Sequence, residues 1–299
     1  MKGLTLRHLR YFTALAQQGH FGRAAEVCAI SQPALSVQMK ELEEIAGAPL
    51  IERGARQIRL TNLGVAFAER AAGILRSVDD LDGFVRAAQA PFSGVLRIGV
   101  IPTIAPYLLP ALIRHMGLAY AELDLRPREA ITQTLLRDLG EGRLDLAILA
   151  LPVSESGLHE EPLFEEEFVL VRPRAEANAP VPSAEGLLEM RLLLLEEGHC
   201  FRDQALAFCT PARVGSREFM EGSSLTTLVQ MVGAGIGVTL IPEMAVATET
   251  RLADVAVARL PAPRPKRMIG LVWRNSSPMA GQYRQIAEVL RGFGPSAGR

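Results

Sequence analysis

A helical pattern runs for about thirty residues, from Thr61 to Ala90, and it constrains the fold more than any other feature. Its apolar positions recur at helical spacing, at Leu63, Val65, Phe67, Ala71, Leu75, Val78, Leu81 and Val85. A helix this long and apolar is more than a connector, and we expect its stripe to find no partner within the chain and so to dimerise. The segment 90–94 contains Pro91 and Gly94 and ends the pattern. We therefore predict a head of residues 1–61, a linker helix of residues 62–90 and a body of residues 94–299.

The head is basic, which is typical of a DNA-binding module. Residues 1–62 carry eight Lys and Arg against five Asp and Glu, whereas residues 94–299 carry 21 against 24. One helical pattern ends near Gly19, a second spans residues 21–29, and a third begins after Ser31, an N-cap candidate. Two helices joined by a tight turn indicate a helix-turn-helix, whose second helix reads the major groove.

A β-hairpin wing is predicted after the third helix. Residues 50–60 alternate apolar and basic side chains around Gly54, and such arginines contact phosphate or a minor groove. We expect seven residues of the recognition helix and wing to contact DNA: Ser31, Gln32, Pro33, Ser36, Lys40, Arg53 and Arg56. Cys28, by contrast, is expected to pack in the core of the second helix.

The body alternates buried strands with helical patterns, which predicts parallel βαβ units. The predicted strands cover residues 96–100, 123–126, 144–151, 168–172, 192–195, 237–241 and 269–273. The predicted helices cover residues 102–119, 132–140, 225–234 and 280–293. We expect two lobes, lobe I of about residues 94–164 and 268–299 and lobe II of about residues 165–267. A small polar ligand would bind between them at strand ends, near Thr103 and Thr132, although Thr132 could equally be an N-cap.

Two of the three cysteines, Cys200 and Cys209, lie nine residues apart, with His199 and Arg202 flanking the first. A nearby cation stabilises a thiolate, which is the reactive form of cysteine, so Cys200 has the surroundings of an oxidisable cysteine. Cys209 is a second thiol close enough in the chain to act as a resolving cysteine. In one helix their Cα atoms would be about 13 Å apart, whereas a disulfide tolerates about 7 Å, so a bond between them would require refolding. The alternative is that both cysteines are buried and inert. The spacing argues against a zinc site.

Three cysteines are too few for a disulfide framework, which points to a reducing compartment. Neither a signal peptide nor a run of about 18 uncharged apolar residues is present. We therefore expect a cytoplasmic protein with no membrane contact.

The head resembles the LysR-type transcriptional regulators. The resemblance rests on Ala24-Ala25, the run Ser31-Gln32-Pro33-Ala34-Leu35-Ser36, Leu42-Glu43, Gly47, Leu50 and Arg53. The two-lobed body is similar to the effector domain of that family, so the resemblance covers the whole chain. Ile51-Glu52 departs from the family pattern, which more often has Phe-x before the arginine. The resemblance implies an α/β protein with an all-α winged helix-turn-helix, a linker helix and a periplasmic-binding-protein-like effector domain.

Within this family, the segment from Gly198-His199-Cys200 to Phe208-Cys209 looks like the sensor of the peroxide-responsive members. This resemblance implies that Cys200 is the peroxidatic cysteine and Cys209 the resolving one. It also implies a peroxide site made of Thr103, Thr132, His199, Arg202 and Arg267. We expect a regulator and not an enzyme, without metal or cofactor. Its expected partners are an operator in double-stranded DNA, hydrogen peroxide, further copies of itself as a dimer of dimers, and a thiol reductant.

Two alternatives remain open. A LysR-type regulator could bind an organic inducer between the lobes with its cysteines idle, which the His-Cys-x-Arg setting disfavours. A thiol peroxidase could be built on the α/β body, which the N-terminal module disfavours because a peroxidase would not need it.

Overall fold

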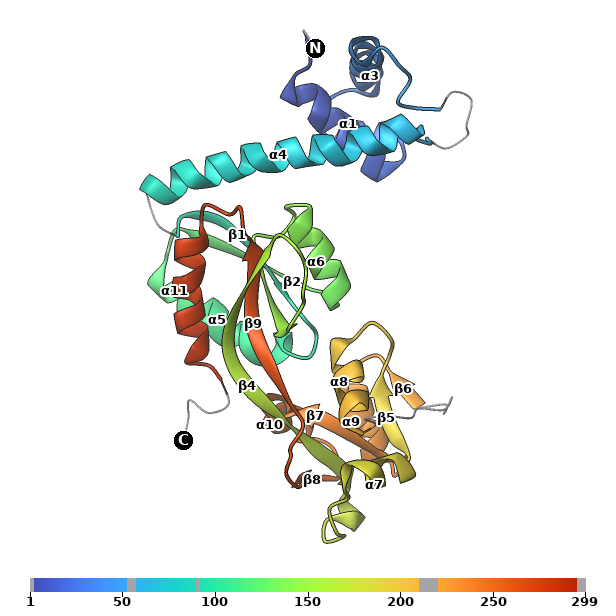
Figure 1. Cartoon of the computed structure of the whole chain (residues 1–299), viewed down its shortest axis with the longest axis vertical. Helices are drawn as coiled ribbons and strands as arrows, with labels where there is room; N and C mark the ends of the chain where they lie inside the picture. Colours follow the sequence, from blue (N-terminus) through green and yellow to red (C-terminus); the bar gives the residue numbers. More distant parts are fainter. Residues whose placement is uncertain (1–2, 53–57, 90–91, 210–219, 295–299) are drawn as a thin grey trace. The chain divides into compact units, whose positions relative to one another are not determined.

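The computed structural model describes residues 3–52, 58–89, 92–209 and 220–294. The chain divides into two compact units, one ending at Val85 and the other beginning at Arg86. The first unit is helical and the second is a two-lobed α/β body (Figure 1), which confirms the predicted fold class. The finer domain boundaries stay a prediction.

Three short helices form the head: α1 (Leu6–Gln18), α2 (Phe21–Val27) and α3 (Gln32–Ala46). Helix α1 ends at Gly19, whose φ of 60° is a left-handed conformation that glycine adopts readily. Helix α2 ends at Val27, two residues before the predicted end. Ser31 caps α3 as predicted, because its hydroxyl accepts a hydrogen bond from the Ala34 amide at 3.3 Å. These two caps explain where α1 ends and where α3 begins.

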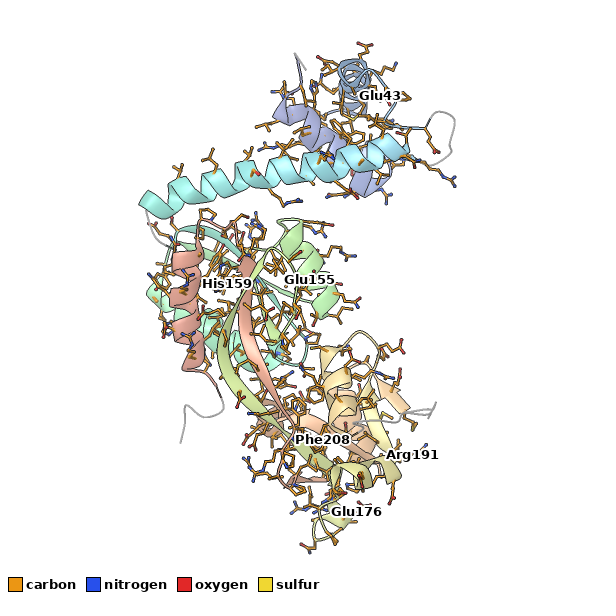
Figure 2. All side chains as sticks on the ribbon, viewed as in Figure 1. Glu43, Glu155, His159, Glu176, Arg191 and Phe208 are labelled. Carbon is orange, nitrogen blue, oxygen red and sulfur yellow. The ribbon has the colours of Figure 1, made fainter. Side chains whose placement is uncertain are left out.

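The apolar faces of these helices meet in one small core. Its fully buried members include Phe12, Leu15, Leu35, Met39, Leu42 and Leu50. Cys28 packs against this core, as predicted, and burial raises the pKa of its thiol. The start of the wing is fixed by Glu43 (labelled in Figure 2), whose carboxylate accepts hydrogen bonds from the Leu50 and Ile51 amides.

Helix α4 (Asn62–Gln89) matches the predicted long helix. The expectation that its apolar stripe has no partner within the chain is wrong for its first half, because Phe67 and Ala68 pack on the head. The ring of Phe67 lies 5.3 Å from that of Phe12, and Ala71 is buried. Other apolar side chains of α4 are exposed: Leu63, Val65, Ile74, Leu81 and Val85.

The body contains a nine-stranded sheet among the described residues. Its strand order is β2-β1-β3-β9-β4-β7-β5-β6, with β8 pairing with β4. The strands are β1 (Gly94–Val100), β2 (Leu123–Glu129), β3 (Leu146–Leu151), β4 (Leu158–Pro173), β5 (Leu192–Leu195), β6 (Met220–Gly222), β7 (Val238–Pro242), β8 (Val255–Arg259) and β9 (Lys266–Arg274).

The prediction of parallel βαβ units holds for only part of this sheet. Strands β1, β2 and β3 are parallel, and so are β5, β6 and β7. Strand β9 is antiparallel to β3 and β4, and β4 is antiparallel to β7 and β8. Strand β4 also begins ten residues before the predicted start, because its first half carries glutamates that do not read as a buried strand.

Strands β4 and β9 run side by side from one lobe into the other (Figure 1). Each lobe has its own apolar core, one containing Ile98, Ile148 and Trp273 and the other Leu170, Leu194 and Leu240. The lobes are therefore two packed bodies joined by a shared pair of strands.

Helices pack on both lobes. Lobe I has α5 (Ala105–Ala119), α6 (Thr132–Gly140) and α11 (Ala280–Arg291). Lobe II has α7 (Ala184–Glu189), α8 (Cys200–Cys209), α9 (Leu225–Gly233), α10 (Val246–Glu249) and the 3-10 helices η1 (Arg174–Glu176) and η2 (Glu243–Ala245). Helix α5 begins three residues later than predicted, so Thr103 lies in the turn between β1 and α5.

Candidate functional site

A buried ion pair lies where β4 and β9 cross between the lobes. The register pairs Glu166 of β4 with Arg267 of β9, and both side chains are completely buried. Arg267 Nε and Nη2 lie 2.9 and 2.8 Å from Glu166 Oε2. The second carboxylate oxygen accepts a hydrogen bond of 2.9 Å from the Met244 amide of η2. Both carboxylate oxygens of Glu166 therefore have hydrogen-bond partners. Sequence reasoning did not identify this residue, because it lies within an acidic run that is typical of an exposed segment.

Arg267 also donates two hydrogen bonds to Thr103. Its Nη1 donates to Thr103 Oγ1 at 2.8 Å, and its Nη2 donates to the Thr103 carbonyl at 3.1 Å. A guanidinium only donates hydrogen bonds, so the Thr103 hydroxyl is the acceptor in this contact. The hydroxyl proton of Thr103 is consequently available to donate to another group. The structure thus brings together two of the predicted peroxide-site residues.

The predicted reactive cysteine begins helix α8 at the junction of the two lobes. Cys200 is half-buried and packs against the core of lobe I, whereas the next residue, Phe201, is buried in the core of lobe II. The Arg267 guanidinium lies 5.5 Å from the centre of the Phe201 ring. Arg267 therefore lies between Thr103 and the first turn of α8. The N-terminus of a helix also favours negative charge, such as a thiolate.

The loop before Cys200 lies against the start of α6. Gly198 has a φ of +94°, and a Cβ added to it would lie 3.2 Å from the Ile131 side chain. Ile131 is the N-cap of α6, so Thr132 is its first helical residue and does not act as the cap. The Thr132 hydroxyl oxygen is buried without a hydrogen-bond partner. A buried polar atom without a partner is costly, which makes this hydroxyl a candidate contact for a small polar ligand.

His199 is half-buried in the same loop. Burial lowers the pKa of His199 from its usual 6.5, while the carboxylates of Glu196 and Glu129 act in the opposite direction. The net shift is downward, so the imidazole is neutral near pH 7 and can donate one hydrogen bond and accept another.

Arg202 also lies in the first turn of α8, but its guanidinium points to the sheet of lobe II. Its Nη1 donates to the Leu195 carbonyl at 3.0 Å and to Glu221 at 2.5 Å, so it joins α8 to β5 and β6. No described contact links the guanidinium to Cys200. The cation that another element brings to the first turn of α8 is Arg267 of β9.

Gln204 is a residue that sequence reasoning missed as a contact. It follows Cys200 by four positions on α8, so the two side chains lie on one face of the helix. Its side-chain oxygen is buried without a hydrogen-bond partner, as is the Thr132 hydroxyl. The four-residue spacing of Cys200 and Gln204, which places both on one face of a helix, could have identified Gln204 from the sequence.

The two predicted redox cysteines begin and end one helix. Helix α8 runs from Cys200 to Cys209, and at about 1.5 Å per residue their Cα atoms are about 13 Å apart. This spacing exceeds the reach of a disulfide, about 7 Å between Cα atoms. Between the two cysteines, Phe208 packs against the core of lobe II (labelled in Figure 2).

A second polar contact joins the lobes near the ion pair. The Tyr107 hydroxyl of α5 donates to the largely buried Glu249 carboxylate of α10 at 2.7 Å. Burial and the Glu249 carboxylate raise the pKa of Tyr107, which keeps the phenol protonated and donating. Lobe I thus contacts α10 directly, and Glu166 contacts η2 just before that helix.

In the head, the predicted DNA-contact residues of α3 are mostly exposed. Ser31, Gln32, Pro33 and Lys40 are exposed, and Ser36 is half-buried. Ser31 also caps the helix. Arg53 and Arg56 lie outside the described residues. The base of the wing is present, because the Glu52 amide donates to the Arg59 carbonyl at 2.9 Å.

Within the described ranges, no three His, Cys, Asp or Glu side chains gather as metal ligands would. Among those same residues, each helix is too short or too polar to cross a lipid bilayer.

Comparison with known proteins gives the class. Residues 6–65 match the model of the bacterial regulatory helix-turn-helix protein, lysR family, and residues 89–294 match that of the LysR substrate binding domain. The chain belongs to the LysR family of bacterial transcriptional regulators.

Particular members of this family are similar over nearly the whole chain. The DNA-binding transcriptional dual regulator OxyR of Escherichia coli is 40% identical over 96% of this chain and 95% of its own. A probable hydrogen peroxide-inducible genes activator of Streptomyces viridosporus is 44% identical over 96% of this chain and 93% of its own. Among solved structures, a cysteine-to-aspartate variant of full-length OxyR from Pseudomonas aeruginosa has a TM-score of 0.79 at 36% identity, over 97% of this chain and 96% of that one. A hydrogen peroxide-bound cysteine mutant of Corynebacterium glutamicum OxyR has a TM-score of 0.67 at 34% identity, over 97% and 92%.

Proposed function

We propose that this LysR-family regulator senses hydrogen peroxide through Cys200 and signals through a reversible disulfide with Cys209. The observation that carries the proposal is the position of Cys200. It begins α8 at the junction of the lobes, and its loop lies against the start of α6, where the Thr132 hydroxyl is buried without a partner. The names of the relatives, which describe peroxide-inducible activators, support the same function.

In the first step, the Cys200 thiolate attacks one oxygen of hydrogen peroxide. The sulfur–oxygen bond forms while the oxygen–oxygen bond breaks, and the departing oxygen takes up a proton and leaves as water. Thr103 donates its free hydroxyl proton to the peroxide, while Thr132 and Gln204 offer oxygens that accept from it. His199 is neutral and can exchange a proton with the leaving oxygen. Arg267 fixes Thr103 and supplies the nearby positive charge.

In the second step, the Cys209 sulfur attacks the sulfenic sulfur of Cys200. A sulfur–sulfur bond forms, the sulfur–oxygen bond breaks, and the oxygen leaves as water. This step requires α8 to unfold, because its ends are about 13 Å apart as a helix. A thiol reductant later restores both thiols. Each protein molecule consumes one molecule of peroxide for each signalling event, so we do not propose an enzyme.

The signal reaches DNA through the head. We propose that Gln32, Pro33, Ser36 and Lys40 of α3 contact an operator in the major groove, as the LysR helix-turn-helix implies. The exposed apolar residues of α4 would form a contact between copies, and a dimer of dimers is the proposed assembly. The operator places this function in the cytoplasm.

Mass spectrometry of the full-length protein after one equivalent of peroxide tests this function. We expect a Cys200–Cys209 crosslink in the wild type. Cys209→Ser should stop at a sulfenic acid on Cys200, and Cys200→Ser should form neither product. Cys28→Ser should behave as the wild type because Cys28 packs in the head core. A Cys200→Ser protein whose operator binding still responds to peroxide would contradict the proposal.

The same experiment separates the alternatives. A regulator that responds to an organic inducer would leave Cys200 and Cys209 as free thiols after peroxide. A thiol peroxidase would consume many equivalents of peroxide with a thiol reductant. The unpartnered oxygens of Thr132 and Gln204 favour a small hydrogen-bonding ligand such as peroxide.

A further inference from the structure

An ion pair joins the first turn of α8 to the sheet of lobe II. Arg202 Nη1 lies 2.5 Å from Glu221 Oε1 and 3.0 Å from the Leu195 carbonyl oxygen. Leu195 ends β5 and Glu221 is the central residue of β6, and these two strands are parallel neighbours. The Arg202 side chain is 13% exposed and that of Glu221 37% exposed. One guanidinium therefore holds α8 on two strands at once.

This attachment exists only while α8 is helical. Phe201 and Ala205 hold the buried face of the helix by apolar packing, and Arg202 adds the polar attachment. Because Cys200 and Cys209 begin and end the helix, their sulfurs cannot meet until α8 unwinds. Unwinding moves residues 200–209 relative to the sheet, so the bonds of Arg202 to Leu195 and Glu221 break before the disulfide forms.

We propose that Glu221, acting through Arg202, is a positioning residue that sets the rate of the second step and hence the lifetime of the Cys200 sulfenic acid. This inference rests on the proposed function. The first step does not involve the pair, because the Arg202 guanidinium is bound to β5 and β6. In the second step, Cys209 displaces the sulfenic oxygen of Cys200, which leaves as water, and no further oxidant is needed.

The size of the effect follows from the geometry. An interaction that is present in the starting state and already absent in the transition state for opening slows opening by its whole contribution. A charge-assisted hydrogen bond is strong, but solvent screens a pair that is partly exposed. Removing the Glu221 charge should therefore raise the rate of disulfide formation about threefold to tenfold.

The experiment follows both steps in the full-length reduced protein. After one equivalent of peroxide, samples are quenched at intervals with a sulfenic-acid trap and a thiol-alkylating reagent, and mass spectrometry quantifies each form of Cys200. Glu221→Gln should form the sulfenic acid at the wild-type rate and the disulfide about threefold to tenfold faster. The matched control is Glu165→Gln, which removes the exposed pair of Glu165 with Lys266 and should change neither rate.

A double-mutant cycle tests whether Glu221 acts through Arg202. In an Arg202→Gln background, Glu221→Gln should leave the disulfide rate unchanged, because the pair is already absent. Equal disulfide rates in Glu221→Gln and the wild type would overturn the inference. So would an undiminished effect of Glu221→Gln in the Arg202→Gln background. A wild type that forms neither product would instead refute the proposed function, and this inference with it.

Discussion

The hydroxyls of the two threonines in the candidate site differ in their partners. Thr103 accepts a hydrogen bond from the buried Arg267, whereas Thr132 has a buried hydroxyl oxygen that bonds to no described group. Removing the first hydroxyl would disturb both Arg267 and a bound ligand. Removing the second would disturb only the ligand, so Thr132 gives the cleaner test.

Thr132→Val should slow formation of the Cys200 sulfenic acid about tenfold or more, the loss of one well-placed hydrogen bond in the transition state. It should not lower the free energy of unfolding, because no protein hydrogen bond is lost and an unpartnered buried hydroxyl is removed. Stopped-flow oxidation and urea unfolding measure the two effects. Thr13→Val is the matched control, because the Thr13 hydroxyl in the head is also buried without a partner. A wild-type oxidation rate in Thr132→Val would exclude Thr132 from the peroxide site.

His199 should make stability depend on pH. Burial lowers its pKa in the folded protein below the usual 6.5, so the unfolded chain binds the proton more readily. The contribution to stability is therefore fully present above pH 6.5 and is lost as the pH falls through the folded pKa. We expect the difference in unfolding free energy between wild type and His199→Gln to shrink from pH 7.5 to pH 5.5. A difference that is constant over this range would contradict the burial of His199.

At the scale of elements, helices α8 and α4 each bury part of their surface in an apolar core. Helix α8 is held by Phe201 and Ala205 in lobe II, so its cysteines are kept apart by the same contacts that order it. Helix α4 uses Phe67 and Ala68 for the head core and leaves Ile74, Leu81 and Val85 exposed. Ile74 and Leu81 are seven residues apart, the spacing of a coiled-coil seam.

Leu81→Asp should lower the oligomeric state and weaken operator binding together, because it places a charge in the proposed seam of α4. Leu81 is 62% exposed, so the change should leave the fold of each subunit intact. Light scattering and a DNA-binding titration measure the two effects. Leu252→Asp is the control, because Leu252 is even more exposed and lies in lobe II. A Leu81→Asp protein with the wild-type mass in solution would show that α4 is not the contact.

At the scale of the whole molecule, the two lobes share more than strands β4 and β9. Tyr107 of α5 bonds Glu249 of α10, and Glu166 joins Arg267 to the Met244 amide of η2. These contacts connect the proposed peroxide site to the packing of lobe II. A chemical change at Cys200 can therefore alter how the lobes are held together.

Glu166→Ala should destabilise the body by about 3–5 kcal/mol, because it leaves the Arg267 charge buried and uncompensated. Urea unfolding monitored by Trp273, the only tryptophan of the chain, measures this loss. Glu161→Ala is the matched control on the same strand. Glu161 pairs with the partly exposed Arg291, so its loss should cost only about 0–1 kcal/mol. Equal losses in the two variants would contradict the burial of the Glu166–Arg267 pair.

The sequence by itself determined the elements that depend on local patterns. The bounds of α6 and β5, the cap at Ser31 and the length of α4 follow from apolar spacing, capping residues and the break near Pro91. It also determined which residues could carry redox chemistry, because the types and the nine-residue spacing of Cys200 and Cys209 are properties of the chain. The resemblance to one family added Arg267 and implied that Thr103, Thr132, His199 and Arg202 belong to the same site.

Only the tertiary structure decided what those residues contact. Glu166 and Arg267 are one hundred and one residues apart, and only the antiparallel register of β4 and β9 pairs them. The first half of β4 was not predicted as a strand, because its glutamates pair with residues of β9 and α11 that are distant in sequence. Arg202 lies two positions from Cys200 but its guanidinium bonds Glu221, since a helix sends such neighbours in different directions. Contacts between distant segments depend on how strands register and helices pack, and no local pattern records either.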